Sequence, residues 1–137
     1  MDFVRKQGAK QVVLVGASLG GLASIKVAGA ARPAAVVIMA APFGPFPALP
    51  SLQVDTADLQ AITAPKLFIN TEYDAGGFIT STQRMFEVAP EPKNLQIYPG
   101  SAHGTDLFNT EHAGDLTRRL IEFIEKNAPP DRAGTQP

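Results

Sequence analysis

A serine flanked by glycines is the feature of this sequence with the clearest chemical meaning. Ser18 is the centre of Gly16-Ala17-Ser18-Leu19-Gly20, which follows a β-branched run and precedes a stretch rich in alanine. A G-x-S-x-G pattern between a strand and a helix is typical of a nucleophile elbow, a tight turn that lifts the serine hydroxyl above the sheet. We therefore predict that Ser18 is a nucleophile and that the N-terminus of the following helix stabilises an oxyanion.

A serine nucleophile needs a base, and the chain has two histidines, His103 and His112. His103 follows the apolar run N-L-Q-I-Y and precedes the last helical stretch, so it lies in a loop at the carboxyl end of an expected strand. His112 lies inside the expected last helix beside Glu111, and we interpret it as an ordinary solvated helix residue. The sequence therefore predicts that His103 is the base.

The acid that would orient the base is predicted to be Asp74, in the loop segment N-T-E-Y-D-A-G-G. Such an acid fixes the imidazole tautomer and stabilises the imidazolium. Glu72, two residues earlier, and Asp106, three residues after the histidine, are the alternatives. An isolated aspartate beside glycines is more often a turn residue. Here, however, the chain order serine, aspartate, histidine is the order that a hydrolase with this kind of elbow requires.

Four short apolar runs that alternate with helical patterns must position these residues. Runs of this kind predict strands of a parallel sheet with helices on both faces, connected by right-handed crossovers. The expected fold is α/β, in a single domain over residues 1–128 followed by a polar tail at 129–137. The expected strands are Gln11–Ala17, Ala35–Ala40, Lys66–Asn70 and Asn94–Tyr98, and the expected helices are Leu19–Ala31, Phe78–Val88, Thr105–Asn127 and a short one within Met1–Gly8.

The segment Ala41–Ser51 has four prolines and two phenylalanines, which interrupt any regular period. It follows the second expected strand, and ligands of open parallel sheets bind at the carboxyl ends of the strands. The segment is either a surface connector or a flap that faces the substrate. In the second case Phe43, Phe46 and Leu49 would line an acyl pocket.

Composition excludes several classes of protein. The 137 residues are 45% hydrophobic and 18% charged with a net charge of −1, which gives no electrostatic footprint for nucleic acid or an acidic membrane. The chain has no cysteine and therefore neither a disulfide framework nor a thiolate metal site. It has no apolar run of roughly 18 residues and no apolar leader after M-D-F-V-R-K-Q-G. We expect a soluble, cytoplasmic protein.

Three segments together resemble the later half of bacterial α/β-hydrolases of the small esterase and dienelactone-hydrolase-like kind: V-V-L-V-G-A-S-L-G-G, L-F-I-N-T-E-Y-D and Y-P-G-S-A-H-G-T-D-L-F. The resemblance extends from Met1 to about Asn127. It implies an α/β-hydrolase fold with Ser18 as nucleophile, Asp74 as acid and His103 as base. It also implies that the backbone N–H of Leu19 is an oxyanion donor. The expected activity is a carboxylesterase that cleaves small, short-chain acyl esters through an acyl-enzyme, without cofactor or metal.

The chain departs from this family at its start. Such hydrolases usually have eight strands with the nucleophile after the fifth, whereas here it follows the first. The loop that supplies the second oxyanion donor has no counterpart, so the fold is expected to be a truncated, minimal version with about four strands. The strand Gln11–Ala17 would then be a hydrophobic sheet edge, which favours association. We predict a homo-oligomer, a dimer or larger. The alternatives are a fragment of a longer protein and a fold without useful catalysis.

Two other functions are weaker interpretations. V-L-V-G-A-S-L-G-G also looks like the glycine loop of a short-chain dehydrogenase, but that loop wants a glycine where Leu22 stands and an acid where Ala40-Ala41-Pro42 follows the second strand. A hydrolase-like binding or interaction module is the non-enzymatic alternative. The missing oxyanion loop favours it, whereas a complete serine, aspartate and histidine set argues against it.

Overall fold

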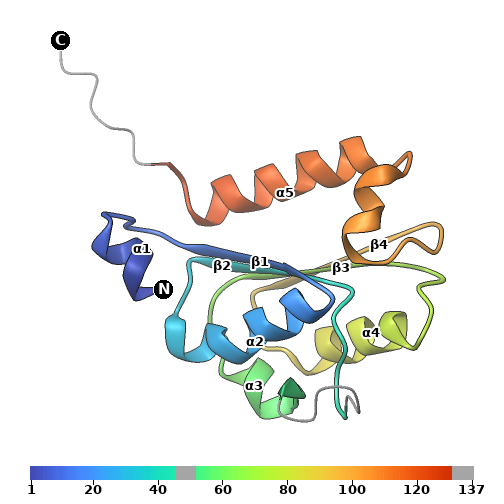
Figure 1. Ribbon diagram of the computed structural model, residues 1–137, viewed down its shortest axis with the longest axis horizontal. Helices are drawn as coiled ribbons and strands as arrows, with labels where there is room; N and C mark the ends of the chain where they lie inside the picture. Colours follow the sequence, from blue (N-terminus) through green and yellow to red (C-terminus); the bar gives the residue numbers. More distant parts are fainter. Residues whose placement is uncertain (46–51, 131–137) are drawn as a thin grey trace.

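The computed structural model describes residues 1–45 and 52–130 and has a four-stranded parallel sheet at its centre (Figure 1). The strands are paired in chain order, β1-β2-β3-β4, so each crossover connects direct neighbours. Their bounds are Val13–Ala17 (β1), Ala35–Met39 (β2), Lys66–Thr71 (β3) and Lys93–Tyr98 (β4). All four expected strands are therefore present, with ends that differ by one or two residues.

Helices cover both faces of the sheet, as the sequence predicted (Figure 1). Helices α2, α3 and α4 lie on one face and α5 lies on the other, while α1 lies beside the start of β1. The helix bounds are Asp2–Lys6 (α1), Leu19–Ala31 (α2), Thr56–Gln60 (α3), Phe78–Val88 (α4) and Ala113–Asn127 (α5). Strand side chains alternate between two buried apolar clusters, so Ile38 packs toward α2 and Met39 packs toward α5. No helix of the described residues is long and apolar enough to cross a bilayer.

The strand register places the ends of the strands at one edge of the sheet. Ala17 pairs with Met39, Met39 pairs with Ile69, and Thr71 pairs with Tyr98. The loops that follow β1, β3 and β4 therefore start close together, although they are far apart in the sequence. This edge is where open parallel sheets bind their ligands.

The prediction of one continuous helix over Thr105–Asn127 is wrong. The structure has a 3-10 helix η2 at Gly104–Asn109, then a turn, and α5 begins only at Ala113. The Thr110 hydroxyl donates to the Leu107 carbonyl at 2.8 Å and accepts from the backbone N–H of His112 at 3.2 Å. These local side-chain bonds compete with helical ones and separate the two helices.

His112 consequently lies at the N-cap of α5 and not inside a helix. Its ring centroid is 5.3 Å from that of Tyr98, and its side chain is 22% exposed. The interpretation of His112 as an ordinary solvated helix residue is therefore wrong, because the turn before α5 directs its ring onto the end of β4.

Helix α3 was not anticipated, although its start carries a recognisable signal. Asp55 accepts from the backbone N–H of Asp58 at 3.0 Å, and the Asp58 carboxylate accepts from the N–H of Asp55 at 3.0 Å. This reciprocal pair is a capping box, in which aspartate takes the place of the usual glutamate. Lys26 of α2 donates to Asp58 at 2.8 Å and joins the two helices.

Strand β1 is an edge of the sheet, as expected. Among the strands of the described residues it pairs only with β2, and Val15 at its centre is 51% exposed, whereas every residue of β2 is buried. The backbone groups on the outer side of an edge strand have no neighbouring strand to bond. The other edge strand is β4, so Ser18 and His103 each follow an edge strand of the sheet.

Candidate active site

Ser18 has a strained backbone conformation at the junction of β1 and α2. Its φ of 51° and ψ of −119° are unusual for a residue with a side chain. Such outliers concentrate at functional sites because the surrounding structure must impose them. The Ser18 N–H donates to the Met39 carbonyl at 2.8 Å, which ties the turn to the end of β2. The G-x-S-x-G segment therefore adopts a sharp strand-to-helix turn.

The glycines around this turn have different roles. A Cβ on Gly16 would lie 2.2 Å from the Gly20 carbonyl oxygen, so only glycine fits at position 16. A Cβ on Gly21 would lie 2.9 Å from that of Ala41. A Cβ on Gly20 would meet nothing within 4 Å. The close approach that the motif was expected to need is therefore provided by Gly16 and Gly21, and the second glycine of the motif is not required by a contact.

Asp74 and His103 are brought together by the loops after β3 and β4. The His103 Nδ1 lies 3.0 Å from both carboxylate oxygens of Asp74. A carboxylate only accepts hydrogen bonds, so Nδ1 carries the proton and Nε2 is left as the basic nitrogen. The Asp74 side chain is 2% exposed and that of His103 is 35% exposed. This is the arrangement in which a buried acid orients a base that solvent and substrate can reach.

Backbone bonds hold these two loops side by side. Glu72 N–H donates to the Tyr98 carbonyl at 2.9 Å, and Tyr73 N–H donates to the Gly100 carbonyl at 2.9 Å. The Thr71 hydroxyl donates to the Ala102 carbonyl at 3.0 Å, directly before His103. Thr71 is a supporting residue that the sequence analysis missed, because its role depends on a loop 31 residues away.

The two alternative acids, Glu72 and Asp106, are exposed. Among the described residues, the His103 ring is hydrogen-bonded to Asp74 and to neither alternative. Asp106 instead contacts the same loop through its backbone, since its N–H donates to the His103 carbonyl at 3.0 Å. The geometry therefore favours Asp74 over both alternatives.

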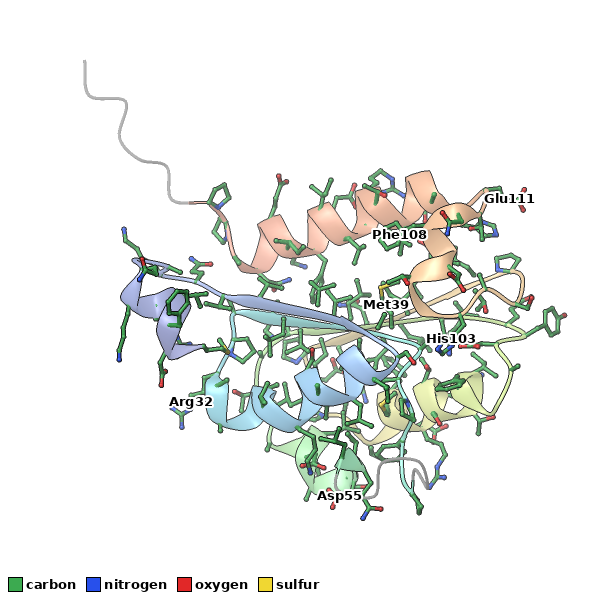
Figure 2. The ribbon with its side chains drawn as sticks, in the orientation of Figure 1. Arg32, Met39, Asp55, His103, Phe108 and Glu111 are labelled. Carbon is green, nitrogen blue, oxygen red and sulfur yellow. The ribbon has the colours of Figure 1, made fainter. Side chains whose placement is uncertain are left out.

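Gly104 brings the histidine loop against the serine turn. Its φ is +54°, and a Cβ on it would lie 3.4 Å from that of Ala17 and 3.9 Å from the Ser18 backbone nitrogen. Figure 2 shows His103 at the same end of the sheet, where the strands finish. No hydrogen bond joins the Ser18 hydroxyl to the His103 ring in the described part of the chain, and such bonds often form fully only when substrate is bound.

The other predicted site residues are Leu19 and the three pocket residues Phe43, Phe46 and Leu49. Leu19 is the first residue of α2, and the first N–H groups of a helix have no partner within it. Phe43 packs against the apolar cluster on the α2 side, with the Arg84 guanidinium 5.5 Å from its ring centre. Phe46 and Leu49 lie outside the described residues. The acyl pocket therefore stays a prediction.

Comparison with known proteins gives structural matches only. No protein-family model matches the chain, and no curated protein matches it. Solved structures match with TM-scores of 0.76 for an esterase domain from Rhodothermus marinus, 0.75 for a monoacylglycerol lipase from Paleococcus ferrophilus and 0.65 for a dienelactone hydrolase from Anabaena variabilis. Their identities to this chain are 20%, 17% and 27%, in that order, and the matches cover 91%, 93% and 85% of it.

The matches cover only part of the length of each solved structure. They cover 65% of the esterase domain, 73% of the lipase and 50% of the dienelactone hydrolase. The chain therefore corresponds to about half to three quarters of each of these proteins. The chain has the α/β-hydrolase fold, in a partial form with a four-stranded sheet.

Proposed function

We propose that the chain is a serine hydrolase, a carboxylesterase that acts on small, short-chain acyl esters. One observation carries the proposal: His103 is bonded to Asp74, and the residue that follows His103 in its loop, Gly104, packs against the turn that holds Ser18. A nucleophile, a base and an acid that orients the base are the components of acyl transfer by a serine enzyme.

In the proposed mechanism, His103 Nε2 takes the hydroxyl proton of Ser18 as the serine oxygen attacks the ester carbonyl. Asp74 accepts the hydrogen bond from Nδ1 of the resulting imidazolium and thereby stabilises its charge. The N–H of Leu19 donates to the oxyanion, and the N-terminus of α2 adds its partial positive charge. The alcohol leaves with the proton from His103, and water then hydrolyses the acyl-enzyme with His103 again as base.

The structural relatives support a hydrolase in general terms. An esterase, a lipase and a dienelactone hydrolase share this fold, and all three names describe hydrolysis of esters. The triad chemistry serves thioesterases, lactonases and amidases equally. Short acyl chains are part of the proposal, and a comparison of butyrate with long-chain emulsions tests them.

The test is hydrolysis of p-nitrophenyl acetate and butyrate by the purified chain and by Ser18→Ala. We expect turnover by the parent and a decrease of at least about a thousandfold in kcat for the variant. Ser24→Ala is the matched control. Ser24 lies on α2, the helix that follows Ser18, and its hydroxyl donates to the Gly20 carbonyl at 2.8 Å. An equal decrease in both variants would contradict a nucleophilic role for Ser18.

A hydrolase-like binding module is the second candidate, and the uncovered edge at β1 favours it. If the parent, Ser18→Ala and Ser24→Ala are equally inert on acetate, butyrate and a thioester analogue, the enzymatic proposal fails and the binding module becomes the better interpretation. Faster turnover of long-chain emulsions than of butyrate would contradict only the short-chain part of the proposal.

A further inference from the structure

The Phe78 ring packs against the His103 ring in a tilted arrangement. The two ring centroids are 4.3 Å apart, and the ring planes are inclined by 53°. Phe78 is the first residue of α4, and His103 lies in the loop after β4, so the contact joins two segments that are separated by 25 positions in the sequence. The local sequence around Phe78 contains no pattern that indicates a partner in a distant loop.

The turn before α4 holds the Phe78 ring in place. Gly76 and Gly77 both have positive φ, +68° and +80°, so the chain turns sharply just before the helix begins. A Cβ on Gly76 would lie 3.3 Å from the Phe78 Cε2 atom. The ring therefore packs against the turn through Gly76 and contacts the imidazole of His103. The same loop carries Asp74, so one segment of chain supplies both contacts to the histidine.

We propose that Phe78 is a positioning residue for His103, an inference that rests on the proposed function for its effect on rate. Asp74 fixes one edge of the imidazole through Nδ1, but a single hydrogen bond leaves the ring free to tilt about that edge. A phenyl ring at 4.3 Å restricts this tilt. Its π-face also attracts a cation, so it stabilises the imidazolium that forms when the serine proton is transferred.

A split between kcat and KM tests the role in the reaction. We expect Phe78→Leu to lower kcat for p-nitrophenyl butyrate by about tenfold, because a small misplacement of a catalytic group slows the chemical step. KM should change less than twofold, since the proposed role of Phe78 is to orient the base. Phe78→Tyr keeps the ring and should retain most of the parent kcat. Phe86→Leu is the matched control, because Phe86 lies on the same helix and contacts the Phe68 ring instead.

Imidazole ¹⁵N chemical shifts test the positioning without any need for turnover. With two histidines in the chain, a His112→Gln variant assigns the spectrum. We expect His103 to hold its proton on Nδ1 in the parent, Phe78→Tyr and Phe86→Leu, and to show mixed tautomers in Phe78→Leu. Unchanged shifts together with an unchanged kcat in Phe78→Leu would overturn the inference. A parent without esterase activity that still loses the Nδ1 tautomer in Phe78→Leu would support positioning while rejecting the proposed function.

Discussion

The two halves of the candidate site differ in how much of the fold supports them. Asp74 and His103 lie on loops that three backbone or hydroxyl hydrogen bonds hold together, and the Asp74 side chain is 2% exposed. Ser18 follows β1, which has one neighbouring strand and a half-exposed Val15 at its centre. The acid and base are thus tied to each other by contacts between the loops after β3 and β4, whereas the nucleophile depends on the turn after β1.

This contrast indicates which contacts position each group. The hydrogen bond to Asp74 and the ring contact with Phe78 orient His103, and both partners belong to this chain. The geometry of Ser18 depends instead on backbone strain, on the close contact of Gly16 with Gly20 and on one bond to the end of β2. Substitutions in the loops of Asp74 and His103 should therefore alter chemistry, whereas those of exposed side chains on β1 should alter association.

Asp74→Asn should have the largest effect on activity. The amide cannot stabilise the imidazolium and favours the wrong tautomer of His103, so kcat for p-nitrophenyl butyrate should fall by about 10³- to 10⁴-fold. The fold should survive, because asparagine has nearly the same volume. Steady-state kinetics and thermal unfolding measured on the same preparation separate the two effects.

Glu72→Gln and Asp106→Asn are the controls for that experiment. Both carboxylates are exposed, and both were alternatives on sequence alone. Each control should keep kcat within about threefold of the parent, the usual scatter of such effects for a residue outside the mechanism. A decrease for Glu72→Gln as large as that for Asp74→Asn would show that the acid has been misassigned.

Gly104→Ala should have the next largest effect, because Gly104 is where the two halves meet. Its φ of +54° disfavours a side chain, and the new Cβ would lie 3.4 Å from Ala17 beside the serine turn. A left-handed conformation costs roughly 1–2 kcal/mol for a residue with a Cβ. A Cβ at 3.4 Å makes an ordinary contact, so the effect comes from the strained backbone: a loop that moves to relax this strain displaces His103 from the serine turn, and kcat should fall by about 10- to 100-fold.

Gly100→Ala is the matched control for this prediction. Gly100 also has a positive φ, +103°, but a Cβ on it would meet nothing within 4 Å. It should therefore lower the unfolding temperature without a comparable loss of kcat. Equal losses of activity in the two variants would mean that backbone strain in general, and not displacement of His103 from the turn at Ser18, accounts for the effect of Gly104→Ala.

Val15→Lys tests whether copies of the chain associate along the edge strand β1. A homo-oligomer remains our prediction, and a second copy of the chain that pairs along β1 would cover the edge. We expect light scattering to give a mass above the 14.5 kDa of one chain for the parent and close to 14.5 kDa for Val15→Lys. Charged side chains on edge strands oppose such pairing. Ile121→Lys, at a 50% exposed apolar position on α5, is the control and should keep the parent mass. A monomeric parent at micromolar concentration would refute the prediction.

The features that sequence predicted well are those set by short-range patterns. Continuous β-branched runs located all four strands, and Pro33 and Pro90 marked where α2 and α4 end. Chain order, combined with the carboxyl ends of the strands, selected Asp74 and His103, which the structure brings to 3.0 Å. A parallel sheet in chain order makes this possible, because successive loops must then emerge at one edge.

The features that sequence missed depend on contacts between distant segments. Thr71, Phe78 and Gly104 support the site through residues on other loops, and no local pattern marks them. The break before α5 arises from the Thr110 side chain, which competes with the helix at a position where apolar periodicity continued on both sides. Periodicity gives the face of a helix but not the residue at which its backbone bonding stops.

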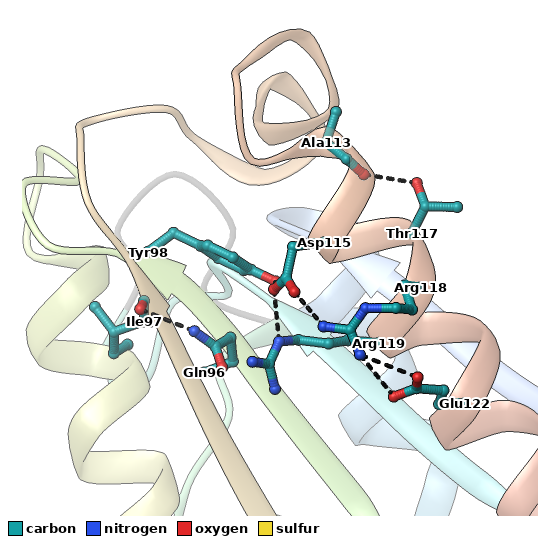
Figure 3. A network of polar contacts seen from close by, with 9 residues as sticks. All are labelled: Gln96, Ile97, Tyr98, Ala113, Asp115, Thr117, Arg118, Arg119 and Glu122. Carbon is teal, nitrogen blue, oxygen red and sulfur yellow. Dashed lines mark hydrogen bonds and ion pairs between the residues drawn. The ribbon is translucent and has the colours of Figure 1, made fainter.

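Tyr98→Phe should have the smallest effect and tests how firmly α5 is attached to β4. Tyr98, the last residue of β4, donates to Asp115 at 2.8 Å, and Arg119 donates to the same carboxylate oxygen at 2.6 Å (Figure 3). Hydrogen bonds from Arg119 and Tyr98 lower the pKa of Asp115 to about 2. Burial and the hydrogen bond to Asp115 raise the pKa of Tyr98 to about 12, so the phenol stays a neutral donor at neutral pH.

The pH dependence follows from the depressed carboxyl pKa. A group whose pKa is lower in the folded state adds stability above its ordinary pKa of 3.8, and this stability is lost as the pH falls through about 2. Urea unfolding should therefore show a small deficit for Tyr98→Phe at pH 6 that shrinks as the pH is lowered from 4 toward 2. Tyr73→Phe, at a 72% exposed position, should show no deficit at either pH. A deficit for Tyr98→Phe that stays constant down to pH 2 would mean that the hydroxyl stabilises the fold independently of the charge on Asp115. The absence of any deficit would mean that ring packing against His112, which phenylalanine keeps, connects β4 to α5.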